Sequence, residues 1–233
     1  MKLLRVGQKG HEKPAALDKD GKIRDISSHI SDLNPDHLNF ETITKLQSAD
    51  LASLPEISSS ERIGSCITKP GKFIAIGLNF SDHAAETGAE VPSEPITFMK
   101  ATSCINGPND DIEIVSGSKK LDWEVELGIV IGKHTKHISE AQSQEHILGD
   151  CLVNDISERE WKKEKMGQWV KGKSHDTYGP IGPYIVTKDE IADVNNLKMS
   201  LDVNGKRMQT GNTSTMIFNV DVIVSYLSKY MSL

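Results

Sequence analysis

The stretch Leu121-Asp122-Trp123-Glu124-Val125-Glu126-Leu127-Gly128-Ile129-Val130-Ile131-Gly132 carries the clearest structural pattern in the chain. Its apolar and β-branched residues predict a strand, in which successive side chains point to opposite faces. Glu124 and Glu126 then share one face, and the apolar residues between and around them lie on the other. If the face with the carboxylates is buried, each uncompensated charge costs several kcal/mol, and a divalent cation would remove that cost. If the strand is an edge strand, the same face is simply solvated, and the pattern leaves both interpretations open.

A third carboxylate fits the same site. Asp155 directly follows the apolar run Cys151-Leu152-Val153-Asn154, which predicts a second strand. A side chain at the end of a strand can project into a site. Three carboxylates with no Cys or His nearby favour a hard cation, Mg²⁺ or Mn²⁺ before Zn²⁺. The sequence therefore predicts a metal site formed by Glu124, Glu126 and Asp155.

Two further segments contain candidate catalytic residues. His83 and Glu86 are three residues apart, so on a helical turn they share a face. A carboxylate beside an imidazole fixes its tautomer and raises its basicity, as a general base that activates water requires; a surface pair would have the same spacing. Lys173 could stabilise negative charge that develops on a bound substrate, and a solvated loop lysine is the alternative.

The rest of the chain reads as a strand-rich α+β protein with few helices. Residues 1–32 predict three short strands, and residues 35–62 predict a polar helical region. Asn219 is the expected start of the last helix. Further strands are expected at residues 72–77, 96–100, 111–115, 124–131, 148–154, 184–186 and 199–203. We expect a small accessory domain over residues 1–65 and a metal-dependent catalytic domain over residues 66–233.

Composition narrows the class of partner and the compartment. The chain has 233 residues and a net charge of −6, with 37% hydrophobic and 26% charged residues. An acidic balance argues against a nucleic-acid partner. No apolar stretch approaches the roughly 20 residues that a membrane-spanning helix needs. The three cysteines, Cys66, Cys104 and Cys151, are widely spaced, which favours reduced thiols and a cytoplasmic protein.

Five segments, in this order, resemble the motifs of the fumarylacetoacetate hydrolase family, in its branch of bacterial sugar-acid and acylpyruvate hydrolases. The resemblance covers about residues 69–233. The segments are residues 76–86, 122–127, 153–159, 171–176 and 209–213. Five motifs in the family's order make the match specific, although none of them is specific alone.

The resemblance implies a β-rich mixed sandwich-roll fold, Mg²⁺ or Mn²⁺ as cofactor, and a homodimer. It assigns the metal to the three carboxylates named above. It assigns the activation of water to His83 and Glu86, and the stabilisation of substrate charge to Lys173. Arg159 and Gln209 become neighbours of the substrate.

The function implied is metal-dependent hydrolysis of a carbon–carbon bond in a 2,4-dioxo acid, giving pyruvate and a carboxylic acid. The substrate is expected to be an acylpyruvate or a 2,4-dioxo-3-deoxy sugar acid. The same site could instead serve an oxaloacetate decarboxylase, a ureidoglycolate lyase, or an isomerase or hydratase. The family continues about 40 residues beyond the point that matches Leu233. A fragment is therefore expected, and an inactive binding protein or dimer partner is the alternative of another class.

Overall fold

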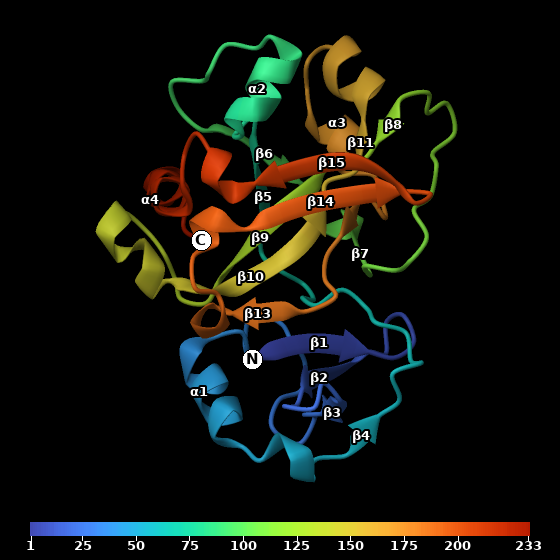
Figure 1. Cartoon of the computed structure of the whole chain (residues 1–233), viewed down its shortest axis with the longest axis vertical. Helices are drawn as coiled ribbons and strands as arrows, with labels where there is room; N and C mark the ends of the chain where they lie inside the picture. Colours follow the sequence, from blue (N-terminus) through green and yellow to red (C-terminus); the bar gives the residue numbers. More distant parts are fainter.

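The computed structural model describes residues 1–233, with the exception of the Thr87 side chain. Its centre is a seven-stranded sheet in the order β4-β3-β2-β1-β13-β10-β9, in which every pair of neighbours is antiparallel (Figure 1). The strands are β1 (Lys2–Val6), β2 (Lys13–Leu17), β3 (Ile23–Asp25), β4 (Glu56–Ile57), β9 (Val125–Ile131), β10 (Ile147–Asn154) and β13 (Ile185–Thr187). The strand-rich α+β class expected from the sequence is confirmed.

The sheet runs without a break from the N-terminal strands into the rest of the chain. β1 pairs with β13, with Leu3 opposite Ile185. One buried apolar cluster contains Leu3 and Ile26 together with Val130 and Ile185. The expected domain boundary at residue 65 therefore lies in a chain segment whose two sides share a sheet and a core, and the division into domains remains a prediction.

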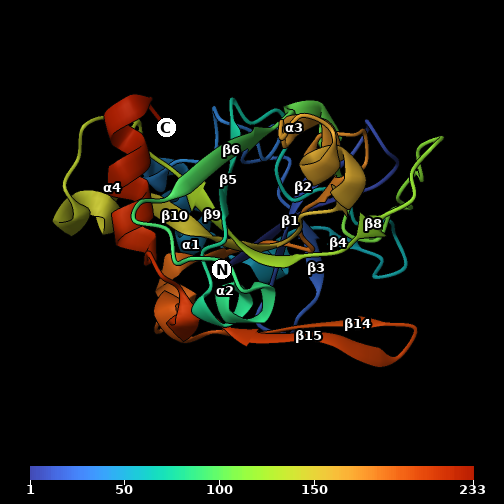
Figure 2. The same ribbon diagram turned by 90° about the horizontal axis from the view of Figure 1, so that it is seen from above.

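Four smaller strand pairs surround this sheet. The hairpin of β14 (Lys198–Val203) and β15 (Lys206–Asn212) forms a separate layer, which Figure 2 shows clearly. The hairpin of β5 (Phe73–Gly77) and β6 (Ile96–Lys100) lies on the other side of β9 and β10 in the same view. The remaining pairs are β7 (Ile105–Asn106) with β12 (Gly179–Pro180), and β8 (Leu121–Asp122) with β11 (Ser157–Glu158).

Helices are few and short. The α-helices are α1 (Phe40–Ser48), α2 (Ser81–Thr87), α3 (Val170–Lys173) and α4 (Val220–Tyr230). Asn219 caps α4 by accepting a hydrogen bond from the backbone N–H of Val222, so the last helix begins where the sequence predicted. Single 3₁₀ turns lie at Leu51–Ser53, Thr102–Cys104, Glu140–Glu145, Lys188–Glu190, Val194–Asn196 and Thr213–Thr215, and a π-helical segment at Glu160–Glu164. No helix among the described residues is long and apolar enough to cross a membrane.

Several local expectations were wrong. The polar region 35–62 has one α-helix, the nine-residue α1, followed by a separate 3₁₀ turn and by β4; Asp50 starts the turn by accepting from the backbone N–H of Ala52. Residues 111–115 form no strand, and the backbone N–H of Glu113 donates to the Thr177 hydroxyl. The sequence analysis also missed β15, which is mostly polar and pairs with β14 across the Asn204-Gly205 turn.

Candidate active site

Lys173 lies at the centre of a buried cluster of charges. Its side chain is 0% exposed, and its ammonium Nζ lies 2.6 Å from Glu124 Oε2 and 2.5 Å from Asp155 Oδ2. The same ammonium lies 5.3 Å from the centre of the Phe98 ring. The structure thus brings together three residues that the sequence singled out, and it joins the two carboxylates through one cation.

A second buried lysine supports Asp155 from the other side. Lys100, the last residue of β6, is 1% exposed, and its Nζ lies 2.6 Å from Asp155 Oδ1. It also donates to the backbone carbonyl of Lys173. Each oxygen of Asp155 therefore has its own ammonium, and both lysines are paired with a carboxylate, as buried charges require.

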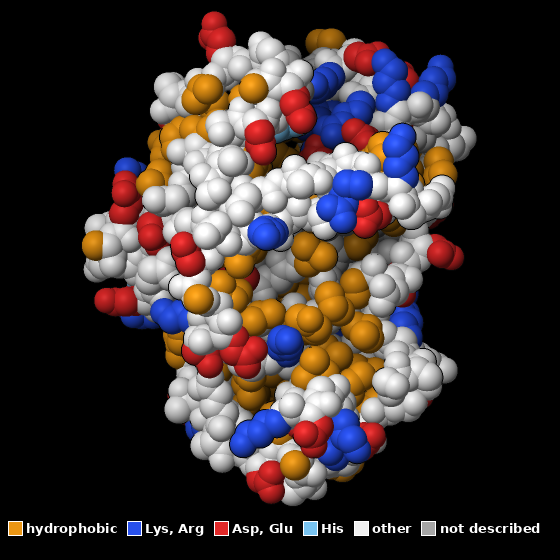
Figure 3. All heavy atoms as spheres, in the orientation of Figure 1, with side chains coloured by type: hydrophobic (Ala, Val, Ile, Leu, Met, Phe, Trp, Pro, Cys, Tyr) orange, Lys and Arg blue, Asp and Glu red, His pale blue; other side chains and the backbone are white. Residues whose placement is uncertain are grey.

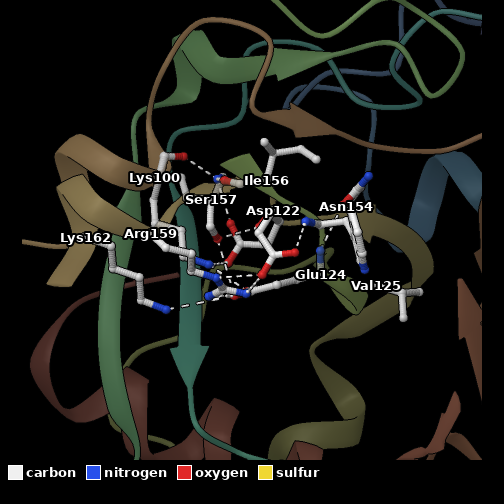
Figure 4. A network of polar contacts seen from close by, with 12 residues as sticks. Lys100, Asp122, Glu124, Val125, Asn154, Ile156, Ser157, Arg159 and Lys162 are labelled. Atoms are coloured by element: carbon white, nitrogen blue, oxygen red, sulfur yellow. Dashed lines mark hydrogen bonds and ion pairs between the residues drawn. The ribbon is translucent and has the colours of Figure 1, made fainter. Parts of the chain in front are cut away.

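Glu124 interacts with the other cationic side chains of the cluster. Arg159 Nη1 lies 2.5 Å from Glu124 Oε1, and its Nε donates to Asp122 Oδ2 at 2.8 Å. Lys162 Nζ lies 3.9 Å from the same Glu124 oxygen and 4.4 Å from the Trp169 ring centre. Figure 4 shows Arg159 and Lys162 approaching Glu124 from one side. In Figure 3, blue and red side chains gather at this end of the molecule, around α3 and β8.

The two glutamates of the E-x-E motif differ in electrostatics. Burial alone would raise the pKa of Glu124, but Lys173, Arg159 and Lys162 hold it at about 2. Burial raises the pKa of Glu126 to about 8, and the negative charges of Glu124 and Asp155 add to this shift. No described side chain forms an ion pair or hydrogen bond with the Glu126 carboxyl. Glu126 is therefore the one carboxyl of the three that lacks a cation.

Backbone geometry explains how these side chains reach one place. Asp155 follows the last residue of β10, and its backbone N–H donates to the Glu124 carbonyl at 2.8 Å. The backbone N–H of Glu124 donates to the side chain of Asn154 at 3.2 Å. These bonds replace regular pairing, so Glu124 lies outside β9, one residue before the strand that was expected to include it. The prediction that Asp155 ends a strand is confirmed.

Gly172 allows α3 to pack closely enough to hold Lys173 next to Glu124. A Cβ at this position would lie 2.6 Å from the Glu158 carbonyl oxygen and 2.7 Å from the backbone nitrogen of Lys162. Real Cβ atoms do not approach backbone that closely, so only glycine fits without a shift. The close packing of α3 on this segment holds Lys173 next to Glu124.

The cluster lies at the edge of a large cavity of about 790 Å³. Lys100, Glu126 and Asp155 line the cavity, together with apolar residues of β5, β9 and α4. A mostly apolar cavity with a few polar groups at one place is the usual form of a small-molecule site. The charged groups can therefore act on a ligand that enters from this cavity.

The other predicted residues lie at different distances from the cluster. Gln209 on β15 accepts a hydrogen bond from the backbone N–H of Val125 at 2.9 Å, so it lies against the start of β9. His83 and Glu86 lie on α2 with exposed side chains, and the structure does not include them in the polar network around Glu124. Their shared helical turn agrees with the expected spacing, and their catalytic role remains a prediction.

Sequence reasoning missed four members of the network. Lys100 and Lys162 belong to segments that carry no motif, and Asp122 and Ser157 contact Arg159 and Glu124 only because β8 pairs with β11. Lys162 is the most notable, because burial and the nearby Lys173 lower its pKa to about 8. Its charge, unlike that of an exposed lysine, therefore changes near neutral pH. The lysine-rich segment before Trp169 was the one feature of the sequence that could have indicated Lys162.

The cluster as it stands is not a formed metal site. Among the described residues, no group of three or more His, Cys, Asp or Glu side chains is arranged so that it could hold a metal ion. The Lys173 ammonium lies between Glu124 and Asp155 instead. By donor type the three carboxylates fit a hard divalent cation, and the unpaired Glu126 is the observation that favours the fit.

Comparison with known proteins gives consistent results. The family model described as "Fumarylacetoacetate (FAA) hydrolase C-terminal" matches residues 72–233. A relative from Burkholderia ambifaria named "Putative hydrolase" is 54% identical over 233 residues, which are all of this chain and 83% of the relative.

Solved structures agree with this match. The fumarylacetoacetate hydrolase of Exiguobacterium antarcticum is 31% identical and superimposes with a TM-score of 0.85, covering 100% of this chain and 83% of the other. The 2-hydroxyhepta-2,4-diene-1,7-dioate isomerase of Mycobacterium marinum is 29% identical with a TM-score of 0.73 and the same coverage. The similar proteins thus include both a hydrolase and an isomerase.

Proposed function

Because this chain belongs to the fumarylacetoacetate hydrolase family, we propose that it hydrolyses a carbon–carbon bond in a 2,4-dioxo acid. The substrate would be an acylpyruvate or a 2,4-dioxo-3-deoxy sugar acid, and the products pyruvate and a carboxylic acid. The observation that carries the proposal is the cluster of Glu124, Glu126, Asp155 and Lys173 at the edge of an apolar cavity. The acid end of such a substrate matches the charged end of the cavity, and the acyl chain of an acylpyruvate matches the apolar wall.

In this proposal Glu124, Glu126 and Asp155 hold Mg²⁺ or Mn²⁺. Glu126 supports the assignment, because a buried carboxyl with a pKa of about 8 binds a proton until a cation replaces it. The ion, when bound, supplies a Lewis acid that polarises the substrate's 2-oxo group. Lys100 and Lys173 would keep the position of Asp155 fixed through its two oxygens.

Other residues of the chain would move protons, stabilise the developing charge and orient the substrate. His83, oriented by Glu86, takes a proton from water, and the water oxygen forms a bond to the 4-oxo carbon. The bond between C3 and C4 then breaks, its electron pair passes to C3, and protonation there yields pyruvate. Lys173 stabilises the negative charge that develops on the substrate oxygens. Arg159, which pairs with Glu124, and Gln209, which accepts from the backbone N–H of Val125, would orient the substrate.

The first test is turnover of a panel that contains an acylpyruvate, a 2,4-dioxo-3-deoxy sugar acid and oxaloacetate, with Mg²⁺, with Mn²⁺ and with EDTA. We expect release of pyruvate from a dioxo acid that EDTA abolishes. Glu126→Gln should lower this rate by roughly 100-fold or more, the size of effect expected for losing a metal-site contact. Glu61→Gln, at an exposed glutamate, is the matched control. Full activity of the Glu126 variant in EDTA would contradict the proposal.

A second candidate is isomerisation of an unsaturated 2-oxo or 2-hydroxy acid, which the similarity to the Mycobacterium marinum isomerase favours. An isomerase moves a proton and keeps all carbon atoms, so no pyruvate is released. Activation of water is then unnecessary, and His83→Ala should abolish hydrolysis without the same effect on a metal-dependent proton shift. Product analysis by NMR of wild type and His83→Ala distinguishes the two reactions. The homodimer implied by the resemblance and the cytoplasmic location expected from the three cysteines remain part of the proposal.

A further inference from the structure

A second, smaller cavity lies beside β10, next to the start of α4. Its volume is about 280 Å³, and β10, the two 3₁₀ turns after β13 and the start of α4 surround it. Asp150 of β10 lines this cavity, whereas its neighbour Cys151 lines the larger one. Val220 at the start of α4 is the one residue that lines both cavities, and none of the charged residues of the candidate active site lines the smaller one. The smaller cavity is therefore not a part of the candidate active site.

Asp150 is a buried carboxyl without a partner. It sits in the interior of the sheet, opposite Val186 on one side and Ile129 on the other, and is 5% exposed. Its Oδ1 is fully buried and has no hydrogen-bond partner among the described residues. Burial alone raises the pKa of Asp150 to about 6. At neutral pH the cavity thus contains a negative charge that no described side chain of this protein compensates.

The opposite wall of the cavity holds a second buried acceptor without a donor and two further carboxylates. Asn195 Oδ1 is also buried and unpartnered in the described structure. Asp193 accepts from the backbone N–H of Asn195 at 2.9 Å, and Asp221 accepts from Gln144 Nε2 at 2.7 Å. Both carboxylates add negative charge to the rim.

One cationic side chain, that of Lys188, is found among the described lining residues. Its ammonium donates to the Gln144 carbonyl rather than to Asp150. The negative charge of the cavity is therefore not neutralised from within the lining.

We propose that this second cavity binds a small organic cation with several N–H donors, such as a diamine or an alkylguanidine, with Asp150 as its counter-ion and Asn195 as a further acceptor. A bare metal ion fits less well, because the described acidic side chains are not gathered around one point. The volume of about 280 Å³ exceeds that of a single ion and equals roughly nine water molecules at about 30 Å³ each. A molecule of about six to ten heavy atoms fills this space.

The test is isothermal titration calorimetry of the full chain with putrescine and with agmatine at pH 7.5 and constant ionic strength. Wild type and the control variant Asp20→Asn, at an exposed aspartate of a turn, should bind at least one of the amines. Asp150→Asn should weaken that binding at least tenfold. Glu126→Gln should leave it unchanged, which separates this site from the proposed reaction.

Asp150→Asn removes a buried charge, so we expect it to fold with a melting temperature at or above that of wild type. If it does not fold, Asn195→Ala provides the same comparison from the other wall. Equal binding by wild type and both variants would overturn the proposal, and so would a wild-type protein that binds neither amine. Stabilisation by KCl or MgCl₂ that depends on Asp150 would also overturn it, because the site would then hold an inorganic ion.

Discussion

At the scale of single residues, Glu124 and Glu126 show that the neighbours of a buried carboxyl determine its pKa. They are two residues apart, yet their pKa values are about 2 and about 8. Both are desolvated, but Glu124 has Lys173 and Arg159 within ion-pair distance, whereas the charges of Glu124 and Asp155 add to the rise in the pKa of Glu126. The direction of each pKa shift therefore follows from the sign of the neighbouring charge, because Coulomb interactions in a desolvated site are strong.

The raised pKa of Glu126 predicts a pH-dependent stability. A carboxyl with pKa 4.5 when unfolded and about 8 when folded binds its proton more tightly in the folded state. Its contribution is fully present below pH 4.5 and is lost as the pH rises through about 8. We expect the metal-free protein to lose stability between these values and Glu126→Gln to lose less. Urea unfolding in EDTA at pH 5 and pH 8.5 measures both; parallel pH profiles of the two proteins would contradict the assignment.

Lys173 should be more important for stability than an exposed lysine in a salt bridge. Lys173→Met leaves Glu124 and Asp155 without their shared ammonium, and removal of one partner of a buried pair costs about 3–5 kcal/mol. Lys45→Met is the matched control, since Lys45 forms an exposed pair with Glu41 and should contribute little. Urea unfolding at pH 7 gives both free energies. Equal losses in the two variants would show that the cluster does not depend on Lys173.

At the scale of elements, the short helix α3 depends on one glycine. Gly172→Ala places a Cβ 2.6 Å from the Glu158 carbonyl oxygen, so α3 must move away from β11. We expect a loss of roughly 1–3 kcal/mol, as for overpacking in a core, and a fall in any turnover that uses Lys173. Gly71→Ala is the control, because nothing lies within 4 Å of a Cβ there. Unchanged stability and turnover in Gly172→Ala would mean that α3 adjusts without effect on the site.

At the scale of the whole molecule, the shared sheet and core predict that the chain unfolds as one unit. Ile26 is fully buried in the cluster that also contains Val130 and Ile185, and Ile26→Ala should cost about 2–5 kcal/mol. All three tryptophans lie at or after residue 123. Tryptophan fluorescence in Ile26→Ala should therefore report the same shift in urea midpoint as circular dichroism. A fluorescence midpoint that does not move would show that residues 1–65 unfold independently.

The sequence predicted most of the local structure and the chemistry of the site. Apolar and β-branched residues around Glu124 and Glu126 indicated β9, the apolar run before Asp155 indicated β10, and Asn219 indicated the start of α4. These features depend on residues a few positions apart, so a sequence records them directly. The three carboxylates and Lys173 could be proposed as a group, because their types and strand positions limit the chemistry.

Only the tertiary structure decided which cations neutralise which carboxylates. Lys100 reaches Asp155 across 55 residues of chain, and Lys173 forms ion pairs with both Glu124 and Asp155. It also decided that Asp150 lines a second, smaller cavity. Such relations arise from the packing of distant strands, and the energy of a buried charge depends on all its neighbours. The amino-acid sequence therefore determined the types of the groups, and the fold determined their partners.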